Sequence, residues 1–417
     1  MGLAKSFLKY FLIIMLLSTS ISYKLPSFAF PIDNEVSELA IESFTFLPAD
    51  FDPDSQIGDC LHPAFTFIDC DDYNPKSKTH VADITIAVID DGLVKAQWEF
   101  LEQNPYARAD IVRYVTKNKE TGNLEEYGKK GLDNPIPDPP QSFEVQHGFA
   151  MVFALATIYR HIKVVFIDMK TNSEDTQGFE KPFDGNTKIW DWLLANHKKY
   201  GINIISMSAV YRNSFAQHEK IVALHNAGIL LISPTGNFNH EYNWYYLTRR
   251  KHFYPQLYLE WYAIGSVDHS ENRYPGERSI FCSGVRSEAC NSGSSWGSAS
   301  WSADSVDFVM PGNMVPSPRL IYSTSEIEWV APQGTSFSAP YFAATIAIIM
   351  DRFAKGLQDA CGYISLPTKE KILQILKLSS SRTTFDKDIG WGWISLIKAS
   401  TEAYHAGNNP GYCFTPW

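Results

Sequence analysis

The sequence has little of what several classes of protein need. Its formal net charge is −10, so it does not have the basic excess that a general nucleic-acid binder carries. We find no internal repeat and no low-complexity tract, which argues against a repeat architecture. The apolar run over residues 11–17 is too short to span a bilayer comfortably. Hydrophobic residues make up 45% of the chain, the composition of an ordinary globular protein.

Cysteines are few, and none is spaced as a metal ligand would be. There are six in 417 residues, and no two have the CxxC spacing of a zinc site. We therefore expect structural disulfides and neither a metal site nor a catalytic thiol. Six cysteines allow 15 pairings, so the connectivity stays open. Proximity in the sequence favours Cys60–Cys70, Cys282–Cys290 and Cys361–Cys413.

The N-terminus has the pattern of a secretory signal peptide. Lys5 and Lys9 precede the apolar run, and small residues follow it. This order predicts a signal over residues 1–29, cleaved near residue 22 or 29. The expected location is therefore secreted or periplasmic, which agrees with structural disulfides. A membrane-anchored or accidental apolar N-terminus is the alternative.

From about residue 84, short apolar runs alternate with helical patterns. Strands are predicted over 84–90, 163–169, 202–209, 229–236, 261–267 and 306–310, and helices over 147–159, 188–200, 214–226, 341–350, 368–378 and 393–405. Apolar strands that alternate with helices predict an α/β fold with a mainly parallel sheet and helices on both faces.

The same pattern sets the expected domain boundaries. Residues 30–80 are predicted to form an N-terminal extension with a disulfide, and residues 81–405 one α/β domain. Polar or aromatic segments near 104–146 and 238–300 are expected to be insertions, and 406–417 a C-terminal tail.

Four polar residues lie where such a sheet binds its ligands, beyond the carboxyl ends of the strands. Asp90 ends one predicted strand and Asn237 follows another, while His147 and Ser336 begin helices. Each has a plainer explanation, because Asp and Asn are common in turns and a lone histidine is most often near the surface. Together they supply an acid, a base, an oxyanion donor and a nucleophile.

In the catalytic interpretation, Ser336 attacks a carbonyl and His147 takes the serine proton. Asp90 orients the imidazole, and Asn237 donates to the oxyanion together with the backbone N–H of Ser336. Successive strand residues point to opposite faces, so we expect Asp90 and not Asp91 to meet the imidazole.

The four blocks resemble those of subtilisin-like serine peptidases, the subtilases, in the same order along the chain. They are VIDDG at 88–92, HGFAMVFA at 147–154, SPTGN at 233–237 and GTSFSAP at 334–340. The resemblance covers about residues 80–402. It implies the three-layer subtilisin-like fold and hydrolysis of peptide bonds through an acyl-enzyme.

The resemblance also carries expectations about binding. It places Ser208, Ala209, Val210 and Gly236 in the substrate groove. It requires no cofactor for the chemistry. Family members often bind structural calcium, but no EF-hand pattern is visible here. The expected partners are protein or peptide substrates, with no nucleic acid and no membrane after signal removal. The oligomeric state stays open.

The chain also departs from the family pattern. Asp91 replaces a small hydroxyl residue, where a second carboxylate would favour a protonated imidazole. Phe149 and Ala150 stand where Thr and His are usual, and Val210 and Tyr211 replace two groove glycines. The family's preference for large apolar side chains is therefore not carried over.

These departures leave an alternative, a catalytically weak or inactive pseudopeptidase that binds peptides or a partner protein. Two other enzyme classes fit less well. Ser336 does not lie in the GxSxG elbow of an esterase of the α/β-hydrolase type. A sedolisin-like acid peptidase would need a catalytic Glu/Asp pair.

Overall fold

The computed structural model describes residues 45–46, 80–104, 107–118, 121–128, 147–160, 162–168, 187–208, 215–236, 259–267, 306–312, 316–321, 324, 326–332, 334–386 and 389–414. All of them fall within one compact unit, Ser37–Trp417. The predicted signal peptide, Cys60–Cys70 and Cys282–Cys290 lie outside the described residues.

An eight-stranded sheet forms the centre of the unit, in the order β4-β3-β5-β2-β6-β7-β8-β9. Its strands are β2 (Thr85–Asp90), β3 (Ala109–Lys117), β4 (Leu124–Tyr127), β5 (Ile162–Asp168), β6 (Ile202–Met207), β7 (Leu230–Pro234), β8 (Trp261–Val267) and β9 (Phe308–Pro311). Every pair is parallel except β3 with β4. The predicted α/β fold with a mainly parallel sheet is confirmed.

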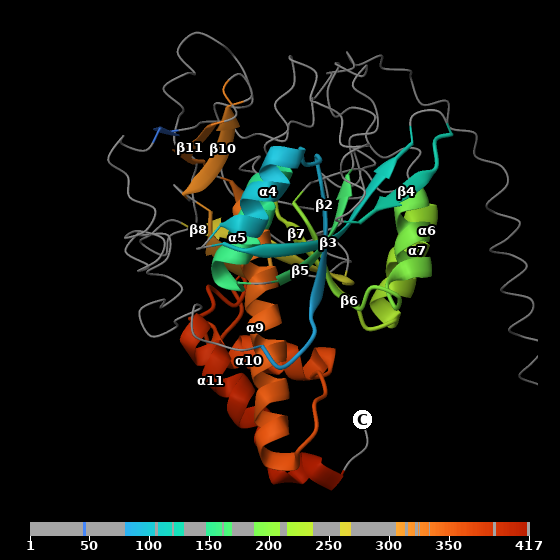
Figure 1. Ribbon diagram of the computed structural model, residues 1–417. Coiled ribbons are helices and arrows are strands. Elements are labelled where there is room, and N and C mark those ends of the chain that lie inside the picture. The colour runs from blue at the N-terminus through green and yellow to red at the C-terminus, as the bar shows by residue number, and fades with distance from the viewer. Residues whose placement is uncertain are drawn as a thin grey trace, which may run out of the picture. The chain divides into compact units, whose positions relative to one another are not determined.

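Helices cover both faces of this sheet (Figure 1). On one face lie α5 (His147–Ile158) and α9 (Thr335–Cys361), and on the other α6 (Thr187–Asn196) and α7 (Phe215–Asn226). Strand β2 shows why both faces are apolar. Ile86 and Val88 pack in the core with α5 and α9, whereas Ala87 and Ile89 pack in the core with α6 and α7. A strand with two buried faces is a continuous apolar run.

Several elements were not predicted. Strands β3 and β4 lie inside the range 104–146, so the expectation of a surface insertion there was wrong for these two segments. Charged residues hide the strand pattern, because β3 is only partly buried near the sheet edge. The other additions are α4 (Lys95–Gln103) and a three-stranded sheet of β1 (Thr45–Phe46), β11 (Glu326–Ala331) and β10 (Ser317–Ile321).

The C-terminal region packs against the long helix α9. It contains α10 (Lys369–Ser379), α11 (Leu396–Gly407) and η7 (Pro410–Phe414). A disulfide joins Cys361, the last residue of α9, to Cys413 in η7. The predicted tail is therefore attached to the C-terminal end of the helix whose second residue is Ser336.

The start of the domain is held by a polar cluster around Asp351 of α9. One carboxylate oxygen accepts from the backbone N–H groups of Val81 and Ala82, at 2.8 and 3.0 Å. His80 lies between the other oxygen, 3.4 Å from its Nδ1, and the Arg160 carbonyl, 2.7 Å from its Nε2. Both partners are acceptors, so the charged imidazolium satisfies both. Burial alone lowers the pKa of His80, but Asp351 and the Arg160 carbonyl outweigh it and raise the pKa above the usual value.

This cluster predicts a pH-dependent stability. The pKa of His80 is higher in the folded than in the unfolded state, so protonation of this ring stabilises the fold. The contribution is fully present below about pH 6.5, the unfolded pKa, and is lost as the pH rises through the folded pKa. The free energy of unfolding, measured with urea from pH 5.5 to 8, should therefore fall less steeply for His80→Gln than for the wild type. Exposed His405→Gln is the control and should keep the wild-type slope. Equal slopes for wild type and His80→Gln would contradict the assignment.

A second prediction concerns the close approach of α5 to β2 and β5 at Gly148. A Cβ placed there would lie 2.6 Å from the Phe166 ring and 2.9 Å from the Gly92 carbonyl oxygen. Gly148→Ala should lower the free energy of unfolding by roughly 1–3 kcal/mol, as overpacking does. Gly128→Ala is the control, because its Cβ would meet only the end of the Arg113 side chain, at 3.2 Å. Similar stability of the two variants would show that the contact at Gly148 relaxes freely.

Candidate active site

Asp90 is the last residue of β2, and its position in the strand decides where its side chain points. It continues the alternate set that contains Ile86 and Val88, which faces α5. The side chain is fully buried. Its Oδ1 accepts two hydrogen bonds, from Nδ1 of His147 at 2.7 Å and from the backbone N–H of Asp91 at 2.8 Å. Strand geometry therefore aims the predicted acid at the predicted base.

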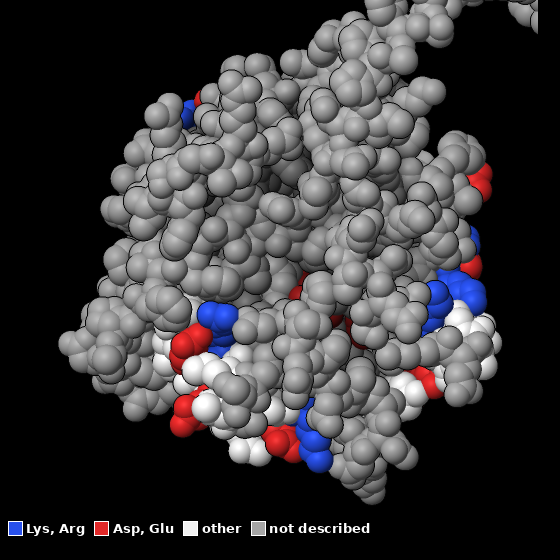
Figure 2. Space-filling model, turned by 90° about the horizontal axis from the view of Figure 1, so that it is seen from above, with Lys and Arg blue, Asp and Glu red and all other residues white. Residues whose placement is uncertain are grey.

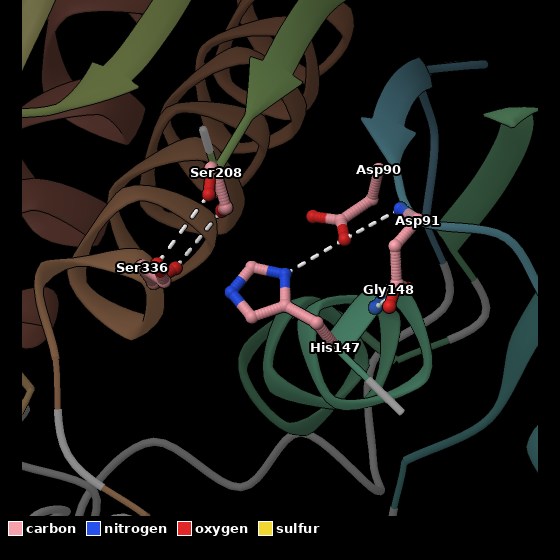
Figure 3. A network of polar contacts seen from close by, with 6 residues as sticks. All are labelled: Asp90, Asp91, His147, Gly148, Ser208 and Ser336. Atoms are coloured by element: carbon pink, nitrogen blue, oxygen red, sulfur yellow. Dashed lines mark hydrogen bonds and ion pairs between the residues drawn. The ribbon is translucent and has the colours of Figure 1, made fainter. Parts of the chain in front are cut away.

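His147 begins α5, a helix in which every residue is buried. The imidazole is 3% exposed. Because a carboxylate only accepts, Nδ1 carries the proton that it donates to Asp90, and the neutral ring then has Nε2 as an acceptor. Figure 3 shows the ring between the two other predicted catalytic residues, with Nδ1 toward Asp90 and the second nitrogen directed toward Ser336. This is the orientation that a general base for a serine hydroxyl needs.

The electrostatics of the pair follow from burial. Desolvation raises the pKa of Asp90, the His147 imidazole opposes that rise, and the adjoining Asp91 carboxylate adds to it. Among the described residues, Oδ2 of Asp90 has no hydrogen-bond partner. A buried carboxylate with one unsatisfied oxygen is strongly stabilised by a neighbouring cation. An imidazolium formed at His147 would therefore be stabilised by the Asp90 carboxylate.

Ser336 is the second residue of α9, directly after the turn at Gly334 and Thr335. Gly334 has φ of 149°, a conformation that side-chain-bearing residues rarely adopt. Pro340 lies four residues after Ser336 and has no N–H, so the Ser336 carbonyl loses its usual helical donor. The hydroxyl of Ser208 donates to that carbonyl instead, at 2.9 Å. Ser336 is thus held by a residue at the end of β6.

The pairing between the two serines is reciprocal. The Ser336 hydroxyl donates to the Ser208 carbonyl oxygen at 3.4 Å, and Figure 3 shows the two bonds side by side. Ser208 follows β6, the neighbour of β2 in the sheet. Asp90 and Ser208 therefore belong to adjacent strand ends, and the helices that carry His147 and Ser336 begin at the same edge.

The turn before Ser336 is anchored on the end of β9. Ser338 donates to the carbonyls of Met310 and Pro311, at 3.0 and 3.2 Å, and the Gly334 N–H donates to the Gly312 carbonyl at 2.7 Å. This role of Ser338 was not predicted. Its place two residues after Ser336 is the only signal in the sequence, and the partners are distant along the chain.

The other predicted site residues are only partly described. Gly236 is buried after β7 with φ of 94°. Asn237, Ala209 and Val210 lie outside the described residues. Asp91 has a role that the sequence did not reveal, because its Oδ1 accepts from the backbone N–H of Gly148 at 2.7 Å.

The described residues contain no cluster of three or more His, Cys, Asp and Glu side chains suited to a metal ion. In this part of the chain, no helix combines the length and apolarity needed to cross a bilayer. On the face seen in Figure 2, the described acidic and basic side chains lie in small groups near one another.

Comparisons with known proteins agree with this geometry. A search of curated protein sequences returned no significant match. A solved structure, that of a lanthipeptide protease, superposes with a TM-score of 0.52 at 14% identity, over 76% of this chain and 87% of that chain. This likeness concerns the fold alone. The family model described as "Subtilase family" matches residues 82–392, which is more than half of the sequence. The chain therefore belongs to the subtilase family of serine peptidases.

Proposed function

We propose that this protein is an exported serine endopeptidase that works through Asp90, His147 and Ser336. Ser336 attacks the carbonyl carbon of a peptide bond while His147 takes the hydroxyl proton at Nε2. The same proton passes to the leaving amine, and the acyl group stays on Ser336. Water, which gives a proton to His147, then attacks the acyl carbon, and that proton passes to the Ser336 oxygen as the ester bond breaks.

The observation that supports this proposal best is the buried hydrogen bond between Asp90 and His147, at 2.7 Å, with the ring directed toward Ser336. A histidine on the surface would not form a hydrogen bond with a fully buried carboxylate. The bond fixes the tautomer, and the carboxylate stabilises the imidazolium that forms in the transition state.

Three further parts of the proposal rest on the sequence. Asn237 follows Gly236 and is assigned as oxyanion donor together with the Ser336 N–H. Ser208 to Val210 and Gly236 are assigned to the substrate groove. Export rests on the lysine, apolar and small-residue order of residues 1–29.

The alternative is a pseudopeptidase that binds peptides without cleaving them, and it is motivated by the departures from the family pattern. One of these departures, Phe149, is weaker evidence for a pseudopeptidase once its surroundings are considered. Phe149 is fully buried and packs edge-on against Phe100 of α4, with ring centroids 5.6 Å apart. Its bulk is accommodated by the core on that side of α5, and this favours the enzyme.

The proposal predicts the effect of removing the nucleophile. Ser336→Ala should lower kcat for cleavage of an unfolded protein substrate by roughly 10⁶-fold, the loss seen when a catalytic serine is removed from subtilisin. It should also abolish labelling by a serine-directed phosphonate. Its thermal midpoint should stay close to that of the wild type, because Ser336 makes few contacts through its hydroxyl.

The outcomes separate the two functions. Equal cleavage by wild type and Ser336→Ala would show that another residue or a contaminant does the chemistry. A wild type that binds peptides but neither cleaves nor takes the label would establish the pseudopeptidase.

A further inference from the structure

Asp91 is a buried acid beside the catalytic pair for which the proposed mechanism has no task. It directly follows Asp90 and is only 4% exposed. Its Oδ1 lies 2.7 Å from the backbone nitrogen of Gly148, the second residue of α5. A carboxylate is costly to bury unless it is hydrogen-bonded or paired with a cation, and the first turn of α5 supplies one hydrogen-bond donor (Figure 3).

The contact has a clear structural meaning. The first N–H groups of a helix have no acceptor within the helix, and a negative charge at that end is favourable. Asp91 supplies both the acceptor and the charge from the end of β2, 57 positions earlier in the sequence. It ties the strand that ends in Asp90 to the helix that begins with His147. The hydrogen bond between Asp90 and His147 therefore depends on the bond between Asp91 and Gly148.

The charge of Asp91 has a second consequence. Burial is the largest cause that raises the pKa of Asp90, and the Asp91 carboxylate acts in the same direction. By the same Coulomb interaction, a second anion next to His147 favours the protonated imidazole. A protonated imidazole cannot accept the serine proton.

Other charged and polar groups also lie near Asp91 and His147. Asp168 at the end of β5 lies close to Gly92, where an added Cβ would be 3.3 Å from its carboxyl group. Tyr114 of β3 donates to that carboxylate at 3.0 Å. The charged pair Lys95–Glu99 of α4 is about half exposed, and Ser208 and Ser336 add no charge from β6 and α9. Among these groups, Asp91 is the acid whose carboxylate accepts a hydrogen bond from the backbone of the helix turn that carries His147.

We propose that Asp91 is a positioning residue that holds the first turn of α5 against β2 and, through its charge, raises the pH above which His147 acts as a base. This rests on the proposed function of Ser336, His147 and Asp90. The two roles can be separated by substitution. Asp91→Asn keeps an oxygen that accepts from the Gly148 N–H but removes the charge, whereas Asp91→Ala removes both.

The test is the pH profile, from pH 5 to 9, of kcat/KM on a peptide substrate and of the rate of phosphonate labelling. For Asp91→Asn, the acidic limb should move to lower pH by about one unit, and the plateau should stay within a few-fold of the wild type. For Asp91→Ala, the limb should move by a similar amount and the plateau should fall about tenfold, because an unsatisfied helix N–H loosens the base.

Asp83→Asn is the matched control. It removes a largely exposed carboxylate, paired with Lys163, from the segment that leads into β2, and it should leave both limb and plateau unchanged. An active wild type with the same acidic limb as Asp91→Asn would overturn the proposal and leave the catalytic assignment intact. A wild type that neither cleaves nor labels would overturn the catalytic assignment and this proposal with it.

Discussion

The cost of burying the Asp90 carboxylate is the constraint on which the site depends. Its side chain is fully buried, and an ionised carboxylate in such a place requires donors or a cation. Its donors are the His147 ring and one backbone N–H. The imidazole is therefore held against the carboxylate. In the proposed mechanism, the same arrangement stabilises the positive charge on the ring after it takes the serine proton.

Close backbone approaches at two glycines shape the scaffold on the side of β8 and β9. A Cβ at Gly312 would meet the Ser266 hydroxyl at 2.3 Å, and one at Gly390 would meet the Asp307 carbonyl oxygen at 2.1 Å. The first contact packs β8 against the residue that follows β9, and the second packs the turn before α11 against the residue that precedes β9. The loop that presents Ser336 rests on the end of β9, so its position is set by the sheet.

The sequence predicted those features that depend on local pattern. Continuous apolar runs gave β2, β5, β6 and β7, and the all-apolar run after His147 gave α5. The strand alternation also predicted that Asp90, and not Asp91, meets the imidazole. Strand β3 was missed because its charged residues hide the strand pattern near the sheet edge. The bond from Asp91 to Gly148 was missed because it joins residues 57 positions apart, which no local pattern reports.

The most direct test of the whole site is a crystal structure of the protein after reaction with a serine-directed phosphonate. The account predicts a bond from phosphorus to the Ser336 oxygen, with Nε2 of His147 within hydrogen-bond distance of the adduct. It also predicts that Nδ1 still donates to Asp90 at a distance near 2.7 Å. A phosphonate attached to another residue, or a His147 ring turned away from both Ser336 and Asp90, would contradict it.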